Sequence, residues 1–174
     1  MKFIFMFLII MFSLTLHAQI QISATPPVEY DQEVLDFYSV KDAYGEFSNF
    51  SLYPIVVDGV NWATSEHYYQ AHKYTETELM ERVRNAKSPM EAALIGRDPN
   101  FPKREDWDEY KDIAMEVAVR AKFAQHEELR KLLKSTGLSK IFEHTKNDCY
   151  WGDCGDRTGK NKLGLLLMQI RSEL

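Results

Sequence analysis

The sequence has little of what several protein classes require. It contains 2 Cys, 8 Gly and 6 Pro among 174 residues, which excludes a disulfide-rich scaffold, a collagen-like repeat and a low-complexity chain. It has no Walker loop, no G-x-G-x-x-G motif and no G-x-S-x-G elbow. These absences argue against nucleoside triphosphate chemistry, a Rossmann cofactor site and an α/β-hydrolase nucleophile.

The chain also lacks the excess of positive charge that is typical of nucleic-acid-binding proteins. There are 26 acidic and 21 basic residues, so any contact with DNA or RNA needs a local basic groove. Hydrophobic residues make up 45% and charged residues 27% of the chain, which is enough apolar material to build a core. The length corresponds to one domain.

The first residues have the pattern of a secretory signal peptide. Lys2 precedes an apolar run at residues 3–12, and the small residue Ala18 follows. The run is short for a membrane span, and the alternative is an uncleaved N-terminal anchor. Cleavage would place the mature protein in the periplasm or outside the cell, with no stable membrane association. The predicted organisation is a signal peptide at 1–18, a flexible tether at 19–33 and a folded domain at 34–174.

Hydrophobic patterning predicts an α+β domain that is dominated by helices. Strands are expected at 34–38 and 140–144, and a hairpin is expected where residues 53–57 and 60–62 flank the Asp58-Gly59 turn. The spacing of apolar residues, together with capping signals at Thr64-Ser65, at residues 75–78 and at Ser88-Pro89, predicts helices at about 64–74, 76–86, 89–95, 107–124, around 129–133 and at 162–174. Thr75 to Glu78 fits a capping box. A Gly- and Asp-rich loop spans 147–161.

Glu66 is the first candidate for catalysis. It lies in the first turn of a predicted helix, where an acid often serves only to stabilise the helix N-terminus. The aromatic residues Trp62, Tyr68 and Tyr69 flank it, so the carboxylate is also placed to be partly desolvated in a cleft. Both interpretations remain open on the residues alone.

The loop after the last predicted strand is the second candidate. It combines Asp148, Trp151 and Asp153, and loops often carry functional residues. The alternative is a tight turn whose Trp fills the core. His67 and His72 are five residues apart and, with Cys149 and Cys154, do not match a paired-ligand spacing. No metal site is therefore predicted.

Several segments resemble the NADAR (YbiA-like) family, in the same order and over residues 36–173. The similarity includes Tyr44–Phe50, Trp62–Ala71, Ser88-Pro89, Gly96–Asp98, Ala118–Phe123, Glu143–Thr145, Asn147-Asp148, Tyr150–Asp153 and Gly159–Met168. The resemblance implies an N-glycosidase that hydrolyses the bond between C1 of a ribose and a nitrogen. The substrates it implies are a ribosylaminopyrimidine phosphate of the riboflavin pathway or an ADP-ribose derivative, including ADP-ribosylated guanine in nucleic acid. It implies no metal or organic cofactor, and a cytoplasmic location is usual in the family.

The resemblance also implies roles for individual residues. Glu66 takes the position of the essential acid, and Asp148 is the expected second acid, which protonates the leaving heterocycle. The expected substrate-binding residues, with Arg97 and Lys122 as phosphate partners, are Asn49, Arg97, Trp107, Lys122, Trp151 and Asp153. The alternative function is a non-catalytic module that binds ADP-ribose or a nucleotide in the same pocket. A third interpretation is a scaffold protein.

Two features depart from the family pattern. The signal-like segment is unexpected, because riboflavin intermediates are made in the cytoplasm. Cys149 and Cys154 bracket the Trp151 loop, and in an oxidising compartment they are expected to form a disulfide that preorganises the pocket.

Overall fold

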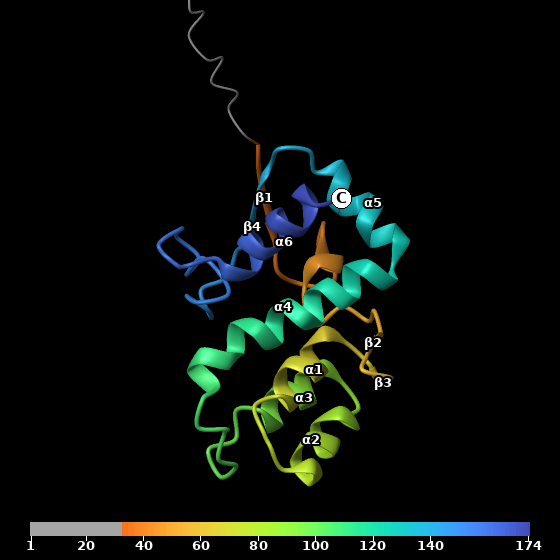
Figure 1. Cartoon of the computed structure of the whole chain (residues 1–174). Helices are drawn as coiled ribbons and strands as arrows, with labels where there is room; N and C mark the ends of the chain where they lie inside the picture. Colours follow the sequence, from red (N-terminus) through yellow and green to blue (C-terminus); the bar gives the residue numbers. More distant parts are fainter. Residues whose placement is uncertain (1–32) are drawn as a thin grey trace, which may run out of the picture. The chain divides into compact units, whose positions relative to one another are not determined.

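The computed structural model describes residues 33–174, and the predicted signal peptide and residues 19–32 of the predicted tether lie outside them. Six α-helices dominate the described residues, together with four short strands and one 3-10 helix, as the α+β prediction expects (Figure 1). In chain order these elements are β1 (Val34–Phe37), η1 (Gly45–Phe47), β2 (Ile55–Val57), β3 (Val60–Trp62), α1 (Ser65–Ala71), α2 (Thr77–Arg84), α3 (Pro89–Ile95), α4 (Trp107–Gln125), α5 (Glu127–Ser135), β4 (Lys140–Glu143) and α6 (Lys162–Ser172). None of the described helices is long and apolar enough to cross a membrane.

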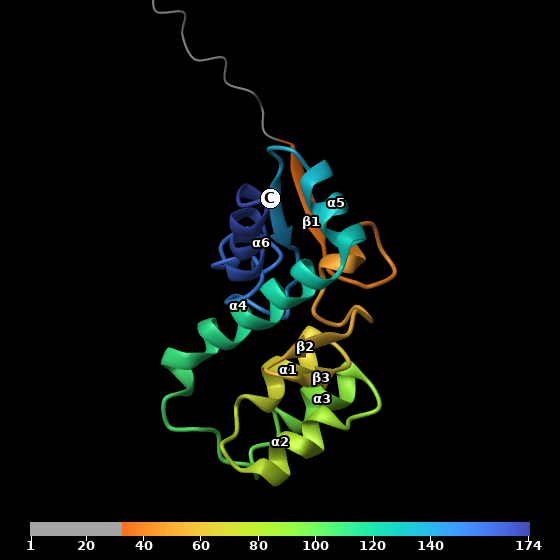
Figure 2. The same ribbon diagram turned by 45° about the vertical axis from the view of Figure 1, so that its right-hand side comes forward.

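The first and last strands pair in parallel. The register places Phe37 opposite Glu143, and α6 packs against β4 (Figure 2). Leu35 and Phe37 point into the core while Val34 and Asp36 are exposed, which is the alternation of a strand with one buried face. The sequence predicts both strands, but not their pairing.

The predicted hairpin is confirmed. β2 and β3 are antiparallel and leave Asp58 and Gly59 as the two turn residues. Their φ angles are 51° and 77°, and a primed turn requires positive φ at both central positions.

The starts of the helices follow the predicted capping signals at two of three places. The Thr64 hydroxyl accepts a hydrogen bond from the His67 amide at the start of α1, and the Ser88 hydroxyl caps α3 ahead of Pro89. The predicted capping box before α2 is wrong. The helix begins one residue later than the box requires, and Glu76 occupies the cap position without a side-chain hydrogen bond.

α4 runs between two groups of helices and strands (Figure 2), each of which has its own cluster of buried side chains. One group joins β1, β4, α5 and α6 and includes Phe37, Phe123 and Leu167. The other joins the hairpin with α1, α2 and α3 and includes Trp62 and Val83. Because α4 contributes to both groups, it fixes α1 relative to the β1–β4 pair.

Candidate active site

A cavity of about 810 Å³ lies where the two groups of elements meet, a size typical of small-molecule sites. Its lining comes from five parts of the chain, which are residues 38–50, α1 with the following Lys73, α3 with Arg97, Met115 of α4, and residues 143–151. Among the predicted site residues, the structure brings Glu66, Asp148, Asn49, Arg97 and Trp151 to this cavity.

Glu66 is a buried carboxylate in the first turn of α1. Its side chain is 5% exposed, and Oε1 accepts a 2.7 Å hydrogen bond from the Gln70 amide one turn later. Burial raises the pKa of Glu66, the Gln70 hydrogen bond and the charges of Lys73 and Arg97 lower it, and the Asp148 charge raises it again. The upward effects prevail, so the pKa of this carboxyl lies above its ordinary value.

Two contacts hold the surroundings of Glu66 in place. The Asn49 side-chain oxygen accepts a 2.9 Å hydrogen bond from the Ser65 hydroxyl, and the Asn49 carbonyl accepts a 3.2 Å bond from the Glu66 amide. Gly96 lies against the Gln70 side chain, and any Cβ at this position would overlap the Gln70 amide. The carboxylate of Glu66 is therefore positioned through both Asn49 and Gln70.

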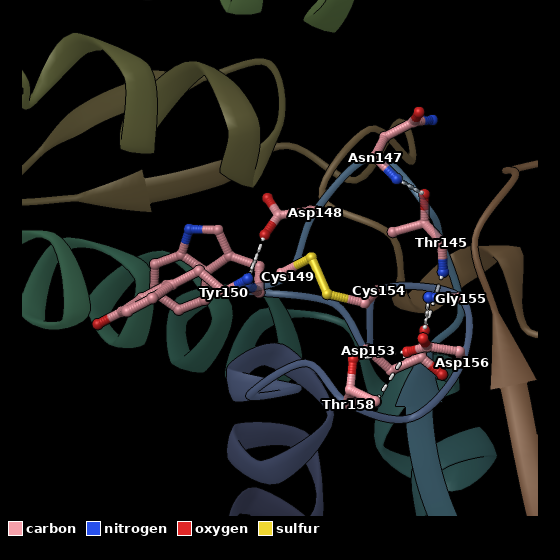
Figure 3. The surroundings of a disulfide bond; sticks show 11 residues. Thr145, Asn147, Asp148, Cys149, Tyr150, Asp153, Cys154, Gly155, Asp156 and Thr158 are labelled. Atoms are coloured by element: carbon pink, nitrogen blue, oxygen red, sulfur yellow. Dashed lines mark hydrogen bonds between the residues drawn. A yellow bond between two sulfur atoms is a disulfide. The ribbon is translucent and has the colours of Figure 1, made fainter.

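The loop after β4 forms another wall of the cavity and contains a disulfide between Cys149 and Cys154, whose Cα atoms are 4.4 Å apart (Figure 3). Within the loop, Asp148 Oδ1 accepts hydrogen bonds of 2.7 and 2.8 Å from the amides of Tyr150 and Trp151. The indole N–H of Trp151 donates to the Tyr69 hydroxyl at 3.1 Å. Both Tyr69 and Trp151 line the cavity.

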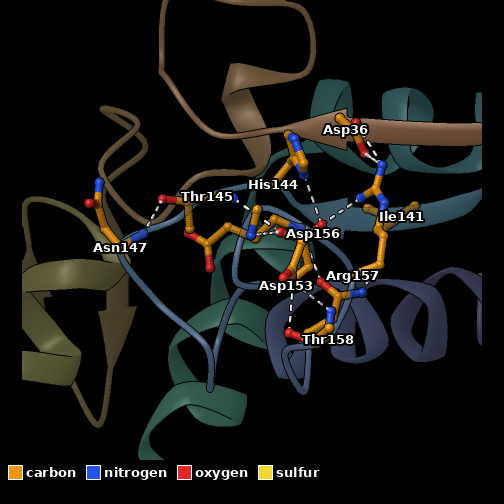
Figure 4. Close-up of polar contacts among 12 residues, drawn as sticks. Asp36, Ile141, His144, Thr145, Asn147, Asp153, Asp156, Arg157 and Thr158 are labelled. Carbon is orange, nitrogen blue, oxygen red and sulfur yellow. Dashed lines mark hydrogen bonds and ion pairs between the residues drawn. The ribbon is translucent and has the colours of Figure 1, made fainter.

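Asp153 does not line the cavity, which corrects its predicted role in binding the substrate. Its side chain is fully buried and accepts hydrogen bonds from the amides of Thr145 and Gly155 (Figure 4). Its other oxygen lies 2.8 Å from Nδ1 of His144 and 2.7 Å from the Arg157 guanidinium. Although burial opposes it, these hydrogen bonds lower the pKa of Asp153, so Asp153 is an anionic anchor for the loop.

Arg157 extends this anchor to the first strand. Its guanidinium also donates two hydrogen bonds, of 2.7 and 2.8 Å, to the Asp36 carboxylate (Figure 4). The loop is thereby tied to β1 as well as to β4.

Lys122 is also placed differently from the prediction. It is fully buried, and its ammonium group donates hydrogen bonds to the carbonyls of Glu46 and Ser48 and to the hydroxyl of Ser51. Burial lowers its pKa to about 7, against a smaller opposing effect from Glu46. Because its three donors are used within the protein, Lys122 supports the segment that carries Asn49 and does not bind phosphate.

Trp107 belongs to the core and not to the cavity wall. It is 8% exposed, and its ring lies 5.2 Å from that of Tyr69, between centroids. Tyr69 lines the cavity and Trp107 packs against it, so the predicted role of Trp107 in binding the substrate does not agree with the structure.

Sequence reasoning missed Lys73, which lines the cavity. Its Nζ donates a 2.9 Å hydrogen bond to the Gly96 carbonyl and lies 5.6 and 5.7 Å from the ring centroids of Tyr69 and Trp107. Burial, followed by the charge of Lys103, lowers its pKa to about 8, although Glu66 opposes this. Lys73 follows the end of α1 at Ala71, and its spacing of three residues from Gln70 and seven from Glu66 is the signal that could have placed it on the same side as these two residues.

Sequence reasoning included Glu143 in a motif but did not identify it as a site residue. It is the last residue of β4 and lines the cavity with Glu66 and Asp148. A strand end gives no pattern that distinguishes a cavity acid from a surface acid. Across residues 33–174 no group of three His, Cys, Asp or Glu side chains is arranged to hold a metal ion.

Comparisons with known proteins identify the family of the chain. The NADAR domain model matches residues 36–174. N-glycosidase YbiA of Escherichia coli is 52% identical over 141 residues, which cover 81% of this chain and 88% of that protein. The chloroplastic riboflavin biosynthesis protein PYRR of Zea mays is 39% identical over 160 residues, covering 83% of this chain and 26% of that protein.

A solved structure shows the same fold. The NMR structure of Escherichia coli YbiA superposes with a TM-score of 0.76 at 50% identity, and the match covers 83% of this chain and 86% of that one. The chain therefore belongs to the NADAR family of N-glycosidases.

Proposed function

We propose that this protein hydrolyses the bond between C1 of a ribose and a heterocyclic nitrogen in a phosphorylated ribosyl compound, with Glu66 as the essential carboxylate. The observation that carries the proposal is the buried Glu66 side chain in the wall of an 810 Å³ cavity. The substrate class is a ribosylaminopyrimidine phosphate, which the name of the maize relative supports, or an ADP-ribose derivative.

The chemistry asks for a negative group beside the sugar. As the C1–N bond lengthens, positive charge develops on C1 and the ring oxygen of the ribose. An ionised Glu66 stabilises this charge and accepts a proton from the attacking water. Burial raises the pKa of Glu66, and Gln70, Lys73 and Arg97 each oppose this by favouring the ionised form.

Two cations in the cavity wall support a phosphorylated substrate. Lys73 and Arg97 both line the cavity, and neither forms a salt bridge with any residue in the described part of the chain. Arg97 is exposed, so its guanidinium is accessible and can form a bidentate hydrogen-bonded pair with a phosphate. We assign Arg97 to the phosphate, and Asn49 and Trp151 to the rest of the substrate.

Glu66→Gln is the test. The substitution keeps the size and the hydrogen-bonding ability of the side chain but removes the charge, so kcat should fall by a factor of about 100 or more while the protein remains folded. Purified protein is incubated with a ribosylaminopyrimidine phosphate, NAD or ADP-ribosylated guanine in nucleic acid, and released base is measured by mass spectrometry. Glu105→Gln, at an exposed position, is the matched control. Full activity of Glu66→Gln would remove Glu66 from the mechanism.

We also propose that the protein acts outside the cytoplasm, after removal of residues 1–18. The support is the signal-like segment and the disulfide in the cavity wall, because disulfides persist in oxidising compartments.

A further inference from the structure

The backbone of Glu143 is held from three sides. Its amide donates a 3.0 Å hydrogen bond to the Asn161 side chain, and its carbonyl accepts a 3.0 Å bond from the Asp153 amide. On the third side, Phe37 is its partner in the β1–β4 ladder. The side chain therefore projects into the cavity from a fixed point.

The carboxyl group of Glu143 has no partner inside the described protein. Its Oε2 is one of three buried side-chain polar atoms without a hydrogen bond in residues 33–174, and no salt bridge there includes Glu143. An unpaired buried polar group costs free energy. Its retention in the wall of a substrate cavity indicates that a ligand supplies the partner.

The charges around Glu143 differ from those around Glu66. Glu66 has Gln70 as a hydrogen-bond donor, and Lys73 and Arg97 as nearby cations. Glu143 has none of these. Burial raises its pKa to about 8, and the negative charges of Asp148, Glu66 and Asp153 add to the effect. Two acids in one site with such different surroundings take different protonation states. At neutral pH the proton therefore resides on Glu143, whereas only Glu66 has a hydrogen-bond donor and nearby cations that favour its ionised form.

We propose that Glu143 is the general acid of the reaction and donates its proton to the nitrogen of the departing heterocycle. This proposal rests on the proposed function. The C1–N bond breaks, its electron pair goes to the leaving nitrogen, and that nitrogen takes the proton of the Glu143 carboxyl. Water adds to C1 of the ribose, and its proton goes to the Glu66 carboxylate. Exchange with solvent then returns a proton to Glu143 and removes one from Glu66.

Asp148, the second acid expected from the family motif, is less suited to this step. One of its oxygens already accepts hydrogen bonds from the amides of Tyr150 and Trp151, and an oxygen used in this way is an acceptor, not a proton donor. The proposal therefore makes Asp148 a positioning residue that holds the Trp151 loop and adds negative charge beside Glu143.

The experiment compares Glu143→Gln and Glu143→Asp with the unsubstituted protein, using the substrate on which the latter is most active. Glu143→Gln cannot donate a carboxyl proton, so we expect kcat to fall about 100-fold or more, with KM within about threefold. Glu143→Asp keeps an acid and should be at least about tenfold more active than Glu143→Gln. The exposed Glu105→Gln is again the control, and thermal unfolding of each variant reports on folding.

The dependence of rate on pH gives a second readout that a merely structural role would not alter. A required acid that loses its proton near pH 8 makes kcat/KM of the unsubstituted protein fall above that pH. Lys73 also lines the cavity, and its pKa is lowered to about 8, so the fall should be smaller in Glu143→Gln by the part that Glu143 contributes. A Glu143→Gln protein within tenfold of full activity, with the fall undiminished, would overturn the proposal. Absence of hydrolysis by the unsubstituted protein would instead overturn the proposed function, and the role of Glu143 with it.

Discussion

At the scale of single residues, the cavity combines an acid and an amine, and the charge of each shifts the pKa of the other. Glu66 raises the pKa of Lys73 while burial and Lys103 lower it, and Lys73 lowers the pKa of Glu66. Lys73 also touches the rings of Tyr69 and Trp107 through its ammonium group. An amine with a pKa near 8 is partly neutral at slightly alkaline pH, which a guanidinium never is.

Replacement of Lys73 by Arg keeps a positive charge at this position but removes an amine that can lose its proton. We expect Lys73→Arg to lower kcat/KM by a factor of about 10 or more, or about 1.4 kcal/mol of transition-state stabilisation, because a larger, planar and permanently charged guanidinium replaces the ammonium group that donates to the Gly96 carbonyl. Steady-state kinetics measure the change, and Lys103→Arg at an exposed position is the control. Equal activity of both variants would mean that only a positive charge is needed.

The sequence did not predict where several of the candidate site residues lie relative to the cavity. Glu66 and Trp151 belong to local motifs, and both line the cavity. Lys122 belongs to a similar motif, yet its ammonium group donates all its hydrogen bonds to Glu46, Ser48 and Ser51. The reason is that a loop about 70 residues away in sequence packs over it. The role of a charged side chain depends on which distant carbonyl groups surround it, and periodicity carries no information about this.

At the scale of elements, local signals predicted the strands and helices but not their arrangement. The Asp58-Gly59 turn and the long apolar repeat of α4 depend on residues that are close in sequence, and both are found. The parallel pairing of β1 with β4 depends on residues at opposite ends of the domain. This pairing places Glu143 at the cavity. Because the sequence did not predict the pairing, it did not identify Glu143 as a site residue.

The disulfide loop is an element whose effect on stability and on activity should differ. For a sequence separation of 5, the entropy model gives about 2 kcal/mol at most. We expect the double variant Cys149→Ser, Cys154→Ser to unfold only a few degrees lower, while kcat/KM falls about threefold to tenfold because the Asp148 turn and Trp151 become less ordered.

Calorimetry and kinetics measure these two effects, and a thiol titration of the unreduced protein precedes them. No reactive thiol is expected before reduction and two afterwards. Two free thiols in the native, unreduced protein would contradict a role for the bridge.

At the scale of the whole molecule, Glu143 makes stability depend on pH. Its pKa is raised from an ordinary value near 4.5 to about 8, so between these values the folded state holds a proton that the unfolded state has lost. The free energy of unfolding therefore decreases as pH rises through this window. Glu143→Gln lacks this contribution, so its stability relative to the unsubstituted protein should increase between pH 5 and 8 by an amount on the order of a few kcal/mol.

Denaturant unfolding of both proteins across this range measures the difference. Comparison of the two curves removes the opposite effects of His67 and His72, whose pKa values burial lowers, and of Lys122. Parallel curves would show that Glu143 ionises as an ordinary surface acid does.

The β1–β4 ladder also determines when during folding the enzyme becomes competent. Helices α1, α2 and α3 are neighbours in sequence and contact one another, so they can assemble from local contacts. The pairing of Phe37 with Glu143 joins distant parts of the chain, and such pairings form slowly. A nascent chain that ends before β4 has Glu66 on its helix but lacks Glu143, the last residue of β4. The wall of the cavity opposite α1 is thus completed only in a late step, when β1 and β4 pair.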